Sequence, residues 1–221
     1  MKVLITSGGT KEAIDPVRSI TNHATGRLGS IIAEQFLQGG FSVTYICSEG
    51  AALPQLDPIS DISDISNSSL EVVTISSVTQ LAERLEQALR TVQYNCVIHA
   101  MAVSDYSPYG MDTSKKISSD SPYLILVLKR QPKIINCIKE IQPDTLLIGF
   151  KLLSGVSEEE LLQAADKLMK QSKCDFVLAN DLNDIYGDYH KAMLINQAGI
   201  VSRGESKKEI AKMIYDCVAM L

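Results

Sequence analysis

The stretch Lys2-Val3-Leu4-Ile5-Thr6-Ser7-Gly8-Gly9 opens the chain and decides what fold to expect. Its apolar residues are continuous rather than alternating, which is typical of a parallel strand buried on both faces. The two glycines after it predict a tight turn at the carboxyl end of that strand. We therefore expect the first strand of an α/β sheet to lead directly into a turn that a ligand can approach closely.

Strand and helix patterns alternate along the rest of the chain. The predicted strands cover residues 2–7, 41–47, 71–75, 95–102, 123–129, 145–152, 175–182 and 191–196. The predicted helices cover residues 26–38, 132–141 and 157–173, and two more begin after the capping patterns Ser77–Gln80 and Ser206–Glu209. This alternation predicts a doubly wound, mostly parallel, Rossmann-like α/β sheet with helices on both faces.

Length and composition narrow the class of protein. The 221 residues allow one to two domains, and no apolar run approaches the ~20 residues of a membrane helix. The formal charge of −5 argues against bulk nucleic-acid binding. The five cysteines lie far apart and show no zinc-ligand spacing, so buried thiols are the expected role. We expect a cytoplasmic protein without a membrane or nucleic-acid partner.

The loops after the predicted strands are the candidate ligand sites, because ligands of such sheets bind outside the carboxyl ends of the strands. These loops cover residues 8–27, 103–121, 150–156 and 180–190. In the first of them, Gly8, Gly9 and Gly26 would let a ligand approach backbone N–H groups. The long segment 51–69 could be a lid or a plain insertion.

Known nucleotide motifs fit only weakly. The spacing Gly26-x-x-Gly29 stands alone, without the Gly-x-Gly-x-x-Gly that a dinucleotide-binding turn requires, and no P-loop pattern is present. An NAD(P)-dependent oxidoreductase of the short-chain type is therefore an alternative that lacks its main motif. A nucleotide sensor without catalytic activity is a third hypothesis.

Single residues in the loops allow two interpretations each. Asp105 could accept a hydrogen bond from a ribose hydroxyl, hold Mg²⁺, or cap a turn. Lys115 and Lys116 could neutralise phosphates or belong to a solvated loop. His99, inside a predicted strand, is expected to be a hydrogen-bonded core residue.

Several motifs in order along the chain resemble phosphopantothenoylcysteine synthetase (phosphopantothenate–cysteine ligase), a family of coenzyme A biosynthesis, in its stand-alone bacterial form. The matching segments are Val3–Glu12, Ile14–Arg18, Asn22–Gly26, Ala102–Tyr106, Lys116–Ser119, Gly149-Phe150 and Ala179-Asn180-Asp181. The resemblance implies one catalytic domain over residues 1–221. It also implies that 4′-phosphopantothenate is activated as an acyl-nucleotide by CTP, with ATP as the alternative, that pyrophosphate is lost, and that the amine of L-cysteine then attacks.

The resemblance also assigns roles to residues. Asn22 would bond the acyl carbonyl, and Lys116 would bind the triphosphate. Asp105 would hold the ribose. The nucleotide pocket would be lined by Pro132, Ile134 and Phe150, its phosphates would face Lys167 and Lys170 with Mg²⁺ bridging them, and Gly8, Gly9 and Gly26 would shape the backbone. The protein ligands of the metal are not identified.

Some implications concern the whole molecule. No flavin is expected, since the flavin site of fused relatives belongs to a separate decarboxylase domain. The family is dimeric, so we expect a homodimer with a hairpin within residues 103–130 and 183–199. Because the ligands are anionic, the binding edge should be locally basic, with contributions from Lys116, Lys133, Lys167 and Lys170. Arg18 and Arg27 are candidates for the substrate phosphate, although Arg18 could instead pair with Asp15.

Overall fold

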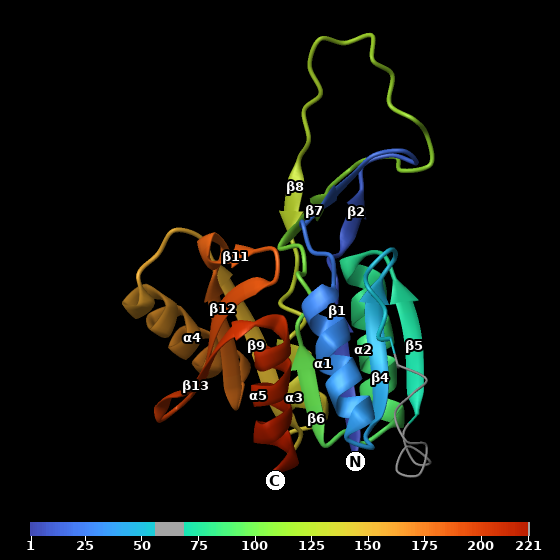
Figure 1. Ribbon diagram of the computed structural model, residues 1–221. Helices are drawn as coiled ribbons and strands as arrows, with labels where there is room; N and C mark the ends of the chain where they lie inside the picture. The colour runs from blue at the N-terminus through green and yellow to red at the C-terminus, as the bar shows by residue number, and fades with distance from the viewer. Residues whose placement is uncertain (56–68, 221) are drawn as a thin grey trace.

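The computed structural model describes residues 1–55 and 69–220, and within them nine strands form one central sheet (Figure 1). The strand order is β11-β12-β10-β9-β6-β1-β4-β5, with β13 paired to β12. The strands are β1 (Lys2–Ser7), β4 (Ser42–Ser48), β5 (Leu70–Ile75), β6 (Cys96–His99), β9 (Leu146–Leu153), β10 (Phe176–Asp181), β11 (Ile185–Tyr186), β12 (Tyr189–Asn196) and β13 (Gly199–Ser206). The run from β10 to β5 is parallel, and β11 to β13 join antiparallel. The predicted fold class is confirmed.

The middle of the sheet is where the order of the strands reverses. β4 and β5 extend from one side of β1, whereas β6, β9 and β10 extend from the other. Ile5 at the centre of β1 pairs with Tyr45 and Ile98, and all three side chains are buried. The carboxyl ends of β1 and β6 thus form a topological switch point, the place where doubly wound sheets bind ligands.

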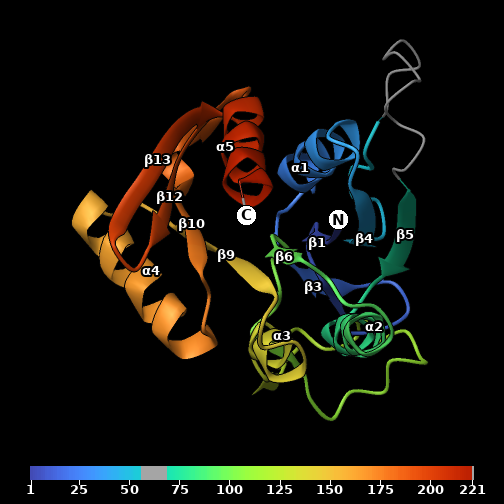
Figure 2. The same cartoon turned by 90° about the horizontal axis from the view of Figure 1, so that it is seen from below.

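Helices cover both faces of the sheet (Figure 2). The helices α1 (Arg27–Gln38) and α5 (Lys207–Ala219) pack on one face, and α2 (Val78–Thr91), α3 (Asn136–Ile141) and α4 (Glu158–Ser172) pack on the other. Side-chain caps at Ser77, Ser157 and Ser206 begin α2, α4 and α5, as the sequence predicts. Each helix starts at the cap because the serine oxygen accepts a backbone N–H that has no partner inside the helix.

Two small hairpins rise beyond the carboxyl edge of the sheet (Figure 1). One joins β2 (Lys11–Ala13) to β3 (Ser19–Thr21), and we call it the β2–β3 hairpin. The other pairs β7 (Tyr106–Pro108) with β8 (Leu128–Arg130); we call residues 106–130 the arm. Both hairpins stand above the switch point.

The structure corrects three expectations about local elements. The strand predicted over 123–129 is wrong for 123–127, which form no strand, because Tyr123 and Ile125 are 83% and 82% exposed and have no core to pack on; only the Val127 carbonyl bonds across the arm, to the Tyr109 N–H at 2.8 Å. The polar loop expected after Gly9 contains the β2–β3 hairpin. The sequence pattern did not reveal β13, a half-exposed edge strand.

Two further expectations concern a lid and a membrane helix. Residues 56–68, which make up most of the possible lid at 51–69, lie outside the described residues. In the part of the chain that is described, no helix is long and apolar enough to span a bilayer.

Candidate active site

The turn after β1 packs tightly against the start of α1. Gly8 and Gly26 have φ angles of +86° and +74°, which only glycine adopts without strain. The hydroxyl of Ser7 donates to the Gly26 carbonyl at 3.0 Å, and a Cβ on Gly29 would lie 2.2 Å from the Ser7 oxygen. The amino end of α1 therefore lies directly beside the end of β1. Its first turn carries no acidic residue, so its dipole remains available to an anion.

Asn22 connects the β2–β3 hairpin to the switch point. Its side-chain Nδ2 donates to the carbonyl of Ala102 at 3.1 Å, while the Ala102 N–H donates to Gly8 at 2.8 Å. A Cβ on Gly9 would lie 2.9 Å from the Asn22 carbonyl, so glycine is needed for this approach. Because an amide carries two N–H donors, Asn22 can bond Ala102 and still donate to a ligand. The structure thus brings together Asn22, Gly8, Gly9 and Gly26.

Asp105 has a partner that the sequence did not predict. Its carboxylate lies 2.5 Å from the Lys133 Nζ, and its backbone carbonyl accepts from the Gln131 N–H at 2.8 Å. Both side chains of the ion pair are about half exposed, so the pair stabilises the fold by less than about 1 kcal/mol. A ligand hydroxyl or phosphate can therefore compete for either group.

A shallow basic cavity of about 590 Å³ lies at the base of the arm. It is lined by Lys129, Arg130, Gln131, Pro132, Lys133 and Asn136. Ile134, predicted to line the pocket with Pro132, is only 8% exposed and packs into the core under α2 and α3. Ile134 therefore supports this turn from below.

The strands beneath the edge hold Phe150 and His99. Phe150 lies in β9 next to Leu178 of β10 and is half-buried against the core under α1 and α5. His99 is buried and its Nδ1 lies 2.9 Å from the Thr6 hydroxyl, so its prediction as a core residue is confirmed. Burial lowers the pKa of His99 to about 4. His99 is therefore neutral near pH 7.

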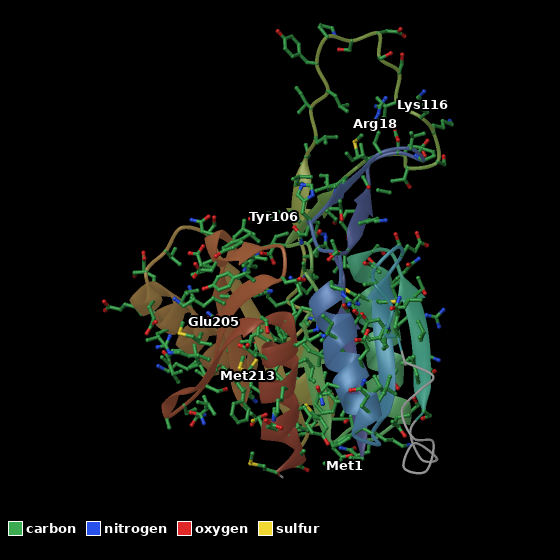
Figure 3. All side chains as sticks on the ribbon, viewed as in Figure 1. Met1, Arg18, Tyr106, Lys116, Glu205 and Met213 are labelled. Atoms are coloured by element: carbon green, nitrogen blue, oxygen red, sulfur yellow. The ribbon has the colours of Figure 1, made fainter. Side chains whose placement is uncertain are left out.

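Two predicted groups of cations lie away from Asn22. Lys116 is exposed on the arm, beside Arg18 of the β2–β3 hairpin and far from Tyr106 at the arm's base (Figure 3). Lys167 and Lys170 lie on the exposed second half of α4, which runs back toward the start of β10. Lys170 pairs with Asp166 at 2.7 Å. The structure therefore places neither group against the glycine turn.

A second cavity, of about 350 Å³, opens near the ends of β9 and β10. Asp181 lines it and accepts from the backbone N–H groups of Gly155, Val156 and Asn183 at 2.7–3.0 Å, which lowers its pKa. The Asn180 amide lies 3.0 Å from the Nε2 of buried His190. Sequence reasoning offered the loop 180–190 but did not foresee these contacts, of which those to Gly155 and Val156 join residues 26 and 25 positions apart.

The described residues contain no group of three or more His, Cys, Asp or Glu side chains placed to hold a metal ion. Mg²⁺ at nucleotide sites is held largely by phosphate oxygens and water, with one or two carboxylates. Asp105, which is half exposed just beyond β6, is a carboxylate at this edge that could take such a role.

These features define a doubly wound α/β domain of the ligand-binding type, whose candidate site lies at the switch point between β1 and β6. The chain matches the DNA/pantothenate metabolism flavoprotein C-terminal domain over residues 1–221, and it belongs to that family. The predicted resemblance is thereby confirmed at the level of the family.

Individual relatives agree with this assignment. The coenzyme A biosynthesis bifunctional protein CoaBC of Thermococcus kodakarensis is 35% identical over 217 residues, which are 97% of this chain and 50% of that protein. The CoaBC protein of Methanocaldococcus jannaschii is 32% identical, over 100% of this chain and 51% of its own length. The chain thus spans about half the length of these curated relatives. A crystal structure of a DNA/pantothenate metabolism flavoprotein from Streptococcus pneumoniae is 36% identical with a TM-score of 0.87, and the match covers 100% of this chain and 99% of that one.

Proposed function

We propose that the chain is a phosphopantothenate–cysteine ligase of coenzyme A biosynthesis. The observation that carries the proposal is the Asn22 amide at the switch point, next to Gly9 and Ala102 and in hydrogen-bond contact with the latter. A neutral donor at this position can bond an acyl oxygen without adding charge. Membership of the family and the names of its relatives in coenzyme A biosynthesis support the same reaction.

The reaction has two steps that need no enzyme nucleophile. A carboxylate oxygen of 4′-phosphopantothenate attacks the α-phosphorus of the nucleotide, and the bond to pyrophosphate breaks. The amine nitrogen of cysteine then attacks the acyl carbon, the nucleoside monophosphate leaves, and the amine proton is lost. Burial raises the pKa of the Cys137 thiol to about 11 and that of Cys174 to about 12, which fits inert structural cysteines. Catalysis then rests on positioning and on charge stabilisation.

The nucleotide, CTP or ATP, would lie along the edge from Asp105 to Phe150. Asp105 would accept from the ribose hydroxyls, and Pro132 would line the cavity at the base of the arm. Lys116 would bind the triphosphate, and Lys133 adds positive charge to the same edge. Asp105 would be the residue to hold Mg²⁺ at this edge, and the ion would supply positive charge to the nucleotide phosphates. Lys167 and Lys170 would also face the phosphates, which requires their side chains to reach the nucleotide from the second half of α4.

The proposal includes a single ligase domain over residues 1–221, a cytoplasmic location and a homodimer. The arm exposes Tyr123 and Ile125 almost fully, and exposed apolar side chains on a projecting segment suit an interface with a second copy. A contribution from the segment 183–199, with β11 and β12, is part of the same proposal.

The direct experiment is a pyrophosphate assay with 4′-phosphopantothenate and L-cysteine, run in parallel with CTP and with ATP. We expect pyrophosphate release that depends on phosphopantothenate. Release without phosphopantothenate would contradict the scheme. Thermal-shift measurements with NADPH against CTP plus Mg²⁺ separate the ligase from the oxidoreductase alternative, which the family does not favour.

A further inference from the structure

A buried carboxylate lies in the turn of the β2–β3 hairpin. The side chain of Asp15 has no exposed surface. Its Oδ1 accepts the backbone N–H groups of Val17 at 2.8 Å and Arg18 at 2.7 Å. This oxygen therefore fixes the local turn that carries Arg18.

The other oxygen of Asp15 reaches a segment 102 residues away. Asp15 Oδ2 accepts the backbone N–H of Ile117 at 3.2 Å and lies 3.4 Å from Nη1 of Arg18. Ile117 follows Lys116 directly in the chain. One carboxylate thus touches the backbone next to Lys116 and the side chain of Arg18, which brings these two residues to the same end of the β2–β3 hairpin (Figure 3).

This contact is the hydrogen bond that joins the outer part of the arm, residues 110–126, to the rest of the described chain. The other hydrogen bonds of residues 110–126 are local, such as Ser114 to Asp112 and Ser118 to Asp120. Among the residues that the structure describes, the Ile117 N–H is the group of this segment that bonds outside it. A long segment held at one internal point loses much of its conformational freedom there.

The carboxylate suits this task at neutral pH. Burial raises the pKa of Asp15, but its backbone N–H donors and the Arg18 guanidinium outweigh that effect and leave the pKa below its ordinary value. Hydrogen bonds to an ionised acceptor are stronger than those to a neutral one. Asp15 is therefore ionised when the enzyme works.

We propose that Asp15 is a positioning residue, which holds Lys116 and Arg18 together as one anion-binding unit at the end of the β2–β3 hairpin. The inference rests on the proposed ligase function, because it assumes that Lys116 acts on the triphosphate. Asp15 touches no substrate. It restricts the position of Lys116 through the Ile117 N–H, and pre-ordering a cation lowers the cost of placing it on a phosphate.

The first test measures the tether itself. In the full chain with Asp15→Asn, amide hydrogen exchange at Ile117 should speed up by about tenfold or more, since the charged acceptor is lost. The matched control is Asp112→Asn, which removes an exposed carboxylate of the arm that bonds only Ser114 and lies near Lys115. Ile117 exchange should stay unchanged in the control. Equal exchange in the Asp15 variant and the unmodified chain would overturn the tether.

The second test asks whether the tether acts through Lys116. Pyrophosphate release is measured with phosphopantothenate and varied nucleotide for Asp15→Asn, Lys116→Gln and the double variant. We expect Asp15→Asn to raise the KM for the nucleotide about tenfold and to have almost no further effect in the Lys116→Gln background. Losses that multiply in the double variant would show a structural role for Asp15 and overturn the inference.

The same data separate the inference from the proposed function. If Lys116→Gln lowers the rate but Asp15→Asn does not, the positioning role fails and the ligase assignment stands. If neither the unmodified chain nor any variant releases pyrophosphate, the ligase function is refuted, and the positioning role of Asp15 in that reaction is refuted with it. The hydrogen exchange at Ile117 still shows whether Asp15 holds the arm.

Discussion

At the scale of the residue, the proposed function depends on the neutral side chain of Asn22. The Asn22 amide donates to Ala102 from a position just after β3, where the chain returns to the end of β1. Carbonyl oxygens gain negative charge when an acyl group is attacked, so a neutral donor stabilises the transition state. A carboxylate of the same shape would accept rather than donate and would repel the developing charge.

The substitution Asn22→Asp tests this directly. We expect turnover to fall by about 10²–10³-fold, the usual effect of losing one oxyanion donor, with the block at the acyl-nucleotide stage. The measurement is a single burst of pyrophosphate without formation of the cysteine amide. Asn95→Asp is the control, because Asn95 lies at the opposite edge and its Oδ1, which accepts from the Lys2 N–H at 2.8 Å, is kept in aspartate. Full turnover in the Asn22 variant would contradict the assigned role.

His99 predicts how stability depends on pH. Burial lowers its pKa from 6.5 to about 4, so between these values the unfolded chain binds a proton that the native protein does not. Stability is complete above pH 6.5 and declines as the pH falls toward 4. The contribution of His99 between pH 7 and 5 is about 2 kcal/mol.

Urea unfolding at pH 7 and pH 5 measures this dependence. The variant His99→Asn removes the titrating ring and should reduce the difference between the two pH values. Buried His190, whose pKa is also lowered to about 4, keeps its own share of the dependence. An unchanged difference in the His99 variant would rule out the assignment.

At the scale of the element, the turn between β1 and α1 sets the geometry of the site. Gly26 begins α1 with φ +74°, and a Cβ there would lie 3.0 Å from Ala51 Cβ and 3.1 Å from Ser7 Oγ. The position therefore combines backbone strain with crowding against the end of β1. The lack of a side chain at Gly26 is what lets the amino end of α1 lie this close to the end of β1.

Gly26→Ala should cost about 1–2 kcal/mol from the left-handed backbone alone, and more because of the crowding. It should also slow the ligase reaction, since α1 must move away from the site. Gly40→Ala is a matched control, because Gly40 has φ +79° but no atom within 4 Å of an added Cβ. Urea unfolding and the pyrophosphate assay compare the two. Equal losses of stability and activity in both variants would show that crowding at Gly26 has no effect.

Elements that depend on local pattern could be predicted from the sequence. The apolar run before Gly8 fixes β1, and the serine caps fix the starts of α2, α4 and α5 because each cap acts within three residues. The β2–β3 hairpin escaped prediction, since its strands are only three residues long and carry polar side chains. Apolar Tyr123 and Ile125 misled the strand pattern because composition does not reveal whether a core lies beneath.

In the candidate site, too, the residues near β1 in the chain could be predicted and the contacts between distant segments could not. The glycines could be proposed because they lie in the loop that follows β1, whereas Asn22 could be proposed only from the resemblance to the family. Two contacts could not be predicted. Asp105 pairs with Lys133, which lies 28 residues further along the chain, and Asp15 bonds Ile117, which lies 102 residues further along. Such pairs are set by how the loops meet at the carboxyl edge, which no local pattern encodes.

At the scale of the whole molecule, the charge distribution opposes the net charge. The chain carries −5, yet Arg18 and Lys116 gather near the end of the β2–β3 hairpin, and Lys129, Arg130 and Lys133 gather at the base of the arm. A local basic region attracts anionic ligands even on an acidic protein. The basic groups at this edge come from the arm, the β2–β3 hairpin and the turn that holds Lys133, whereas Lys167 and Lys170 lie on the second half of α4.

The arm also supports the last prediction, that the chain is a dimer at micromolar concentration. Tyr123 and Ile125 are 83% and 82% exposed, and such apolar side chains gain free energy when a second copy covers them. Replacing both with serine should weaken the dimer by about tenfold or more, since each loses buried apolar area. Val72→Ser, a 42% exposed position on the edge strand β5 outside the proposed dimer segments, should leave association unchanged. Sedimentation equilibrium provides the measurement, and a monomer at micromolar concentration in the unmodified protein would refute the arm as an interface. A dimer that persists in the arm variant but is lost with Val72→Ser would instead place the interface at β5.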